Sequence, residues 1–184
     1  MRRVSARLTR RAALGGAAAV ALGSCGGGDP PPAEGPEAGS GAALLGSLAA
    51  LEHASAVAWE AIGERLSGEA RRYAGAIADR ERAHAERISA LIRDLGGEPP
   101  EGRSPEEYEP QFPLMRTESE ALRFAADLEE QLIREHLDVL RSLPREDQRR
   151  AVAEIAAEEA EDLAVAQSLG GEPATQHAFV TGMQ

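Results

Sequence analysis

From Ala42 onward, apolar residues recur at every third or fourth position in four long stretches. This spacing places them on one face of an α-helix, so the pattern predicts helices rather than strands. The small share of aromatic residues (3%) and the abundance of Ala, Leu, Glu and Arg also favour an all-α fold. The expected helices cover about residues 43–66, 69–95, 117–142 and 144–169.

Glycines and prolines divide these stretches into two pairs. Gly68 separates the first two helices, and a Leu-Gly-Gly-Glu-Pro motif ends the second from Leu95 and the fourth from Leu169. Thr117 opens a capping box for the third helix, and Pro144 suits the first turn of the fourth.

The connection at residues 96–116 is long enough to run the length of a helix. About 20 extended residues at ~3.3 Å each exceed a helix length of roughly 37 Å. The predicted fold is a four-helix bundle of two antiparallel hairpins joined by a long crossover loop, and an up-down-up-down bundle is the alternative. We expect the crossover to be ordered because it carries apolar anchors: Tyr108, Phe112, Leu114 and Met115.

Carboxylates interrupt the apolar faces near the middle of the predicted helices. Glu52, Glu81, Glu129 and Glu159 each stand where the pattern requires an apolar side chain. A buried, ionised carboxylate is costly unless it is paired or bound to a cation. The first two are 29 residues apart and the last two 30, so each hairpin brings its pair to comparable height. We therefore expect the four carboxylates to meet inside the bundle.

Two of these glutamates begin motifs with a second potential ligand. Glu81 and His84 form an E-x-x-H step on one helix face, whereas Glu159 and Asp162 form E-x-x-D. Bundles that hold two iron or manganese ions use a Glu from each of two helices and E-x-x-H from each of the other two. Exchanging an imidazole for a carboxylate favours a harder ion or a weaker second site. The predicted metal ligands are Glu52, Glu81, His84, Glu129, Glu159 and Asp162.

Nearby residues leave alternatives for this site. Glu130 competes with Glu129 for the inward position, Glu158 with Glu159, and Leu163 with Asp162. His136 lies two turns after Glu129, so it is a hydrogen-bond donor behind the ligands, a substitute imidazole ligand or a packed side chain. We expect His53 at the periphery, Trp59 and Tyr73 in the core, and Glu154 and Glu161 in solvent.

Residues 1–24 have the composition of an export signal. They hold five arginines and no acidic residue, and the apolar run Ala12–Leu22 is too short to span a bilayer. Thr9–Leu14 resembles the twin-arginine signal, and Leu22–Cys25 resembles the bacterial lipobox, in which the cysteine is acylated. The predicted organisation is a signal peptide at 1–24, a flexible Gly/Pro-rich tether at 25–42 and a bundle with its C-terminal tail at 43–184.

Composition excludes several other classes of function. The formal charge of −11 argues against nucleic acid as a partner. A single cysteine cannot build a disulfide framework or a thiolate metal site. The chain has no lysine, so Schiff-base chemistry is excluded.

Residues from about Ala43 to Gly182 resemble a ferritin-like domain of exported bacterial proteins. The resemblance rests on Leu51-Glu52-His53, Glu81-x-x-His84 through Leu95-Gly96-Gly97, Asp127-Leu128-Glu129 and Ala178-Phe179-Val180-Thr181-Gly182. It implies a ferritin-like bundle and, in the metal-binding members, a carboxylate-bridged di-iron or di-manganese centre that reacts with oxygen or peroxide.

Two functions follow as hypotheses. The first is an exported, membrane-tethered dimetal protein of oxidoreductase type, anchored through a lipid on Cys25. The second is a metal-free helical lipoprotein with a binding or stress-related role at the cell envelope. A closed storage shell fits poorly with a lipid tether. The expected partners are metal ions and the membrane, and a homodimer with a second copy of the chain is a further hypothesis.

Overall fold

The computed structural model describes residues 37–171. Within these residues, four long helices form a bundle: α1 (Glu37–Gly63), α2 (Gly68–Asp94), α4 (Glu118–Ser142) and α5 (Glu146–Leu169). The short helix α3 (Pro105–Tyr108) and the 3-10 turn η1 (Glu109–Gln111) lie in the crossover, and the described part of the chain contains no strand. The all-α prediction is confirmed. Predictions for the signal peptide, Cys25, the tether up to residue 36 and the tail after residue 171 lie outside the described residues.

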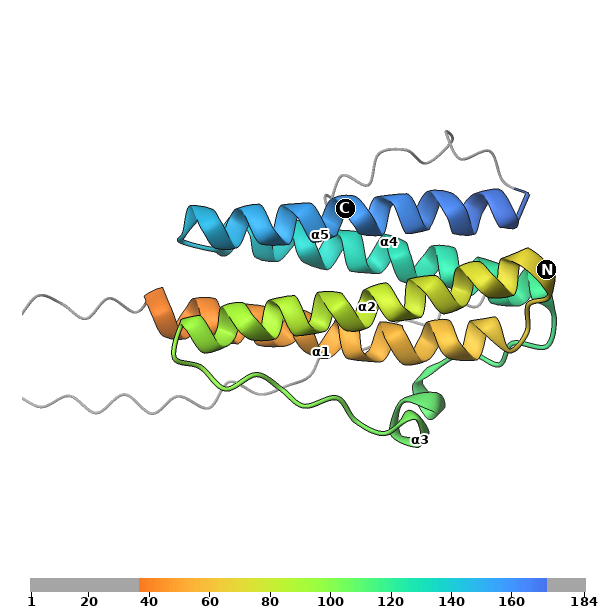
Figure 1. The fold of residues 1–184 in the computed structure, drawn as a ribbon, viewed down its shortest axis with the longest axis horizontal. Helices are drawn as coiled ribbons and strands as arrows, with labels where there is room; N and C mark the ends of the chain where they lie inside the picture. Colours follow the sequence, from red (N-terminus) through yellow and green to blue (C-terminus); the bar gives the residue numbers. More distant parts are fainter. Residues whose placement is uncertain (1–36, 172–184) are drawn as a thin grey trace, which may run out of the picture. The chain divides into compact units, whose positions relative to one another are not determined.

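The helices pair as two hairpins, α1 with α2 and α4 with α5. The crossover runs along the bundle from the end of α2 to the start of α4 (Figure 1). As a result α2 and α4 run in the same direction, while α1 packs against α4 and α2 against α5. The fold is therefore the predicted bundle with a long crossover, and the up-down-up-down alternative is wrong.

The ends of the helices agree with the predicted ends in some places and differ in others. The Thr117 side chain accepts a hydrogen bond from the Glu120 backbone, as the capping box predicts. Helix α1 starts at Glu37, within the predicted tether, and α5 starts at Glu146. Pro144 thus lies before the helix rather than in its first turn, because Arg145 at the N-cap has extended backbone angles.

The crossover is anchored by aromatic and thioether side chains. Tyr108 and Met115 are buried, and the Phe112 ring centroid lies 6.0 Å from that of Phe124 on α4. Leu114 does not anchor the segment as predicted, since 72% of its surface is exposed. Three of the four expected anchors therefore hold this connection against the bundle.

Two apolar clusters fill the core, one toward each end of the bundle. The first contains Trp59, Ile62 and Ile77, and the second contains Leu45, Ile88 and Ile155. Along each long helix, a buried polar segment separates the residues of one cluster from those of the other. The interior is thus apolar at both ends and polar in the middle, which places the polar side chains far from bulk water.

The segment Gly41–Gly63 of α1 is long and apolar enough to cross a membrane by length and composition. Within the bundle, however, its Leu45, Leu48 and Trp59 are fully or almost fully buried. We therefore interpret it as a core helix.

Tyr73 on α2 is 43% exposed, so its predicted place in the core is wrong. That part of α2 buries Ala74 and Ile77 instead, and the ring lies on the outer side.

Candidate metal centre

The polar middle layer draws side chains from all four long helices. Glu52, Glu81, Glu129 and Glu159 are each 0% exposed, and they come from α1, α2, α4 and α5 respectively. His84, His136 and Asp162 are also buried there. The convergence expected from the sequence is therefore present. Glu129 and Glu159 take the inward positions, while their competitors Glu130 and Glu158 remain partly exposed.

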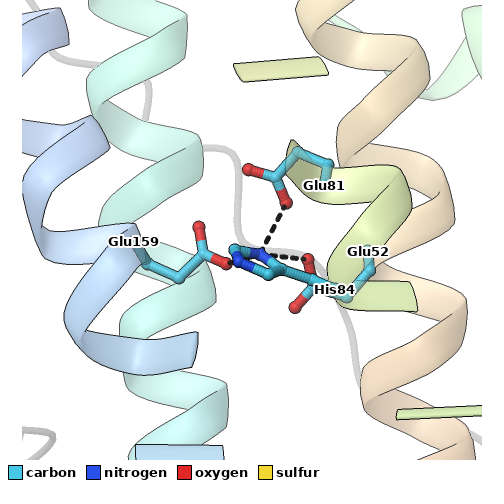
Figure 2. A group of neighbouring side chains, drawn as sticks. All are labelled: Glu52, Glu81, His84 and Glu159. Carbon is cyan, nitrogen blue, oxygen red and sulfur yellow. Dashed lines mark ion pairs between the residues drawn. The ribbon is translucent and has the colours of Figure 1, made fainter. Parts of the chain in front are cut away.

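Four of these residues face one another closely enough to hold a single cation: Glu52, Glu81, His84 and Glu159. One ligand atom from each lies within 4.8 Å of all the others (Figure 2). His84 Nδ1 is 2.8 Å from Glu159 Oε1, 3.7 Å from Glu52 Oε2 and 3.9 Å from Glu81 Oε2. A cation ~2.1 Å from each ligand sets neighbouring ligand atoms roughly 3.0–3.4 Å apart, so small movements would close this set around an ion.

The facing atoms lack hydrogen-bond partners among the described residues. Both carboxylate oxygens of Glu52, Glu81 and Glu159 are unsatisfied, as is His84 Nδ1. The short contact from His84 Nδ1 to Glu159 is electrostatic, because the two atoms are not aligned for a hydrogen bond. Buried polar atoms in proteins are nearly always paired. A cluster of unpaired oxygens and an unpaired nitrogen in one place is therefore what a binding site for a cation requires.

The other nitrogen of His84 is held by a second carboxylate. His84 Nε2 lies 2.9 Å from Glu158 Oε2, in hydrogen-bond geometry, and the Glu158 side chain is 44% exposed. This contact directs Nδ1 toward the cluster. Metal-binding histidines commonly make such a contact with their second nitrogen. Glu158 was predicted only as a competitor of Glu159, but the structure uses both residues in different roles.

Glu129 faces the middle layer but lies outside the four-residue cluster. Its Oε1 accepts a hydrogen bond of 2.5 Å from Trp59 Nε1, while its Oε2 has no partner in the described structure. Glu130 points outward to Arg134. One oxygen of Glu129 is thus committed to the indole and the other is left to face the interior.

Asp162 also lies outside the cluster. Arg80 Nη1 reaches to 2.9 Å from Asp162 Oδ1, and only 1% of the Asp162 side chain is exposed. The arginine therefore offsets the aspartate charge that was predicted to face a metal. Leu163 is buried beside Asp162, so both competitors for this position turn inward.

His136 belongs to the middle layer through a contact with Glu52. Its Nδ1 lies 2.9 Å from the Leu132 carbonyl oxygen, and its Nε2 lies 2.9 Å from Glu52 Oε1. His53, in contrast, is half-buried beside Gly102 of the crossover, which agrees with its expected peripheral place. Glu154 and Glu161 are exposed, as predicted.

Burial and crowding raise the pKa of three acids in the layer. For Glu81 and Glu129, loss of hydration followed by repulsion from Glu159 raises the pKa well above the ordinary value. Burial raises the pKa of Asp162 to about 7, although Arg80 opposes the change. These carboxyl groups therefore hold protons tightly in the metal-free protein.

Ion pairing outweighs burial at Glu52 and the two histidines. Burial alone would raise the pKa of Glu52, but His136 and His84 lower it to about 2. Burial alone would lower the pKa of His84, but Glu159 and Glu52 raise it to about 10. The pKa of His136 is also raised, against its burial, by Glu52. Without a cation, protons on the imidazoles and on Glu81 and Glu129 offset much of the carboxylate charge.

Solved structures of other proteins share this fold. A conserved hypothetical protein from Mycobacterium tuberculosis matches with a TM-score of 0.65 and 16% identity, over 71% of this chain and 98% of its own. A bacterioferritin from Desulfovibrio desulfuricans, described as having a diiron site, matches with a TM-score of 0.59 and 21% identity, over 73% of this chain and 80% of its own. At these identities the likeness shows the ferritin-like fold alone.

Sequence comparison places the chain in a family. No curated protein matches it closely enough to count as a relative. The family model described as "Domain of unknown function (DUF4439)" matches residues 43–172, which include all four long helices except the start of α1. Because this model matches most of the chain, the protein belongs to the DUF4439 family.

Proposed function

We propose that this protein binds iron or manganese in the middle layer of its bundle, at a centre able to take two ions bridged by carboxylate. The observation that carries the proposal is the convergence of unpaired ligand atoms from Glu52, Glu81, His84 and Glu159. Several carboxylates together with an imidazole are ligands that suit these metals. The set contains no sulfur ligand, so it does not suit metals that prefer thiolates.

The bound metal would supply redox chemistry with oxygen or peroxide. The residues of this chain would prepare the site for it. Glu158 orients His84, and the apolar clusters on both sides keep bulk water away from the carboxylates. Low hydration strengthens the attraction between a cation and these charges. The bacterioferritin with a diiron site shows that the shared fold accommodates such a centre, which supports the proposal.

The same charges define a second candidate, a metal-free bundle with a binding role. His84 lies 2.8 Å from Glu159 Oε1 and Arg80 lies 2.9 Å from Asp162 Oδ1, so cationic side chains already offset two of the acids. Such pairing allows the bundle to fold before or without metal loading. Direct measurement of metal binding decides between the two candidates.

The deciding experiment is metal analysis of protein purified without chelator, followed by anaerobic titration with Fe²⁺ or Mn²⁺. We expect at least one ion per chain in the wild type and a loss of binding in Glu81→Gln and Glu159→Gln, which keep side-chain size. Glu154→Gln on the same helix as Glu159 is the matched control, because Glu154 is exposed and pairs with Arg87. A wild type that takes up no ion would support the metal-free candidate instead.

We further propose that the protein is exported and held at the outer face of the cell membrane by a lipid on Cys25. The support is the basic start, the short apolar run and the lipobox-like Leu22–Cys25. In cells grown with a labelled fatty acid, the wild type should carry the label and Cys25→Ser should not. Equal labelling of both, or of neither, would contradict the anchor.

A further inference from the structure

We infer that His136 is the imidazole ligand of a second cation position, which shares Glu52 with the first. This inference rests on the proposed metal centre and specifies how it is completed. The motif expected to supply a second imidazole, on α5, carries Asp162 in its place. The imidazole comes instead from α4, from a residue that no E-x-x-H pattern reveals.

The backbone sets the tautomer of His136. Its Nδ1 lies 2.9 Å from the carbonyl oxygen of Leu132, one helical turn earlier. A carbonyl oxygen only accepts, so Nδ1 must carry the hydrogen of that bond. In the neutral ring Nε2 then has a free lone pair, which is the form that binds a metal.

The Nε2 atom faces the middle layer without a hydrogen-bond partner among the described residues. It lies 2.9 Å from Glu52 Oε1, but the two atoms are not aligned for a hydrogen bond. Two ligand atoms at adjacent corners of an octahedral ion, each ~2.1 Å from it, lie roughly 3.0 Å apart. The observed separation of 2.9 Å is that of an ion pair when the imidazole is protonated, and it is also that of two ligands of one ion when a metal takes the place of the proton. His136 is 0% exposed, so bulk solvent does not reach this nitrogen.

Glu52 connects the two positions. Its Oε1 faces His136 at 2.9 Å, whereas its Oε2 faces His84 at 3.7 Å. A carboxylate whose two oxygens face different imidazoles is placed to bridge two cations. The further oxygens available to the second position are the unpaired ones of Glu129 and Glu159.

Asp162 is less suited to this role because it is already paired. Arg80 lies 2.9 Å from its Oδ1, and a cation beside this pair would meet the guanidinium charge. His136 has no cationic neighbour of that kind in the described structure, and it faces Glu52 directly. For these two reasons we assign the imidazole ligand of the second cation to His136 on α4 and not to the E-x-x-D motif on α5.

The test is the number of ions bound per chain in His136→Leu, measured by anaerobic titration with Mn²⁺. We expect two ions in the wild type, one of which is lost in the variant while the other binds with less than a threefold change in affinity. Two manganese ions that share a carboxylate are spin-coupled, so the wild type should give a coupled electron paramagnetic resonance spectrum and the variant an uncoupled one. His53→Gln is the control because His53 lies beside the crossover.

The outcomes separate this inference from the proposed function. Two ions in His136→Leu, or a single ion in both proteins, would overturn the role of His136 and leave the first position standing. No ion in the wild type would overturn both. If His136→Leu does not fold, wild-type protein with ¹⁵N-labelled histidine is titrated with Zn²⁺. A shift of the Nε2 resonance of His136 at the second equivalent supports the inference, and an unmoved resonance contradicts it.

Discussion

Glu158 Oε2 lies 2.9 Å from His84 Nε2, across the interface between α5 and α2. The contact joins a half-exposed carboxylate to a buried imidazole whose other nitrogen faces the carboxylate cluster. The orientation of the imidazole thus depends on a residue that touches no predicted metal position.

Glu158→Gln should weaken metal binding without removing a ligand. The amide has no charge with which to hold the imidazole and increase its basicity, so affinity should fall by about 10–100-fold. The number of ions bound should stay the same. Titration calorimetry with Mn²⁺ measures both quantities, with Glu154→Gln as the control for loss of an acid from α5. A lower number of ions with unchanged affinity would contradict the orienting role.

Glu81→Leu should make the metal-free protein more stable while preventing metal binding. Both oxygens of Glu81 are buried and unpaired, and an apolar side chain removes their desolvation cost. The free energy of unfolding should rise by about 1–3 kcal/mol. Urea unfolding in the presence of a chelator measures this change. Glu154→Leu should give no such gain because that side chain is exposed, and a similar gain in both variants would refute the explanation.

Trp59→Phe should destabilise the protein by leaving Glu129 Oε1 without its donor. Indole Nε1 donates to this oxygen inside the bundle, and an unpaired buried acceptor costs about 1–3 kcal/mol. Loss of ring volume adds to the effect. The free energy of unfolding is measured in urea by circular dichroism, because the variant has no tryptophan to report fluorescence. Tyr73→Phe at an exposed ring should leave stability unchanged.

The metal-free protein should lose stability as the pH rises from about 6.5 to about 10. Folding raises the pKa of His84 from 6.5 to about 10, mainly through Glu159 and Glu52 acting against burial. The stabilisation that protonated His84 gives to the folded state is therefore complete below pH 6.5, and it is lost as the pH rises from about 6.5 to about 10. The raised pKa values of Glu81 and Glu129 act in the same direction. Thermal unfolding at several pH values should show a smaller decline in His84→Gln, and an equal decline would contradict this assignment.

Metal loading near pH 7 should release protons. Glu81, Glu129 and both buried histidines hold protons more tightly than usual, and ligand atoms must be deprotonated to bind a metal. The observed binding enthalpy should therefore vary with the ionisation enthalpy of the buffer. Calorimetry in two buffers at one pH gives the number of protons released. Identical enthalpies in both would show that the site is already deprotonated.

The repeated spacing of apolar residues was sufficient to predict the bundle. Long stretches such as 69–95 have one apolar face that must be buried. This requirement holds whichever helix packs against that face. Glu81 and His84 could be paired because positions three apart on a helix share a face. The start of α5 was predicted less well, because the cap geometry at Arg145 depends on how the preceding turn packs.

Helical periodicity alone predicted that each long helix turns a carboxylate inward, since Glu52 and Glu81 lie in register with apolar neighbours on their own helices. On α4 and α5 the pattern left the choice between adjacent glutamates open, and the structure buries Glu129 and Glu159. Only the tertiary structure decided what each polar group meets there. Arg80 lies beside Glu81 in the sequence, yet it pairs with Asp162 on α5, and His136 on α4 faces Glu52 on α1. These contacts depend on the rotation and height of one helix against another. Side chains throughout the interface set that packing, whereas the pattern within a single helix says only which face is buried.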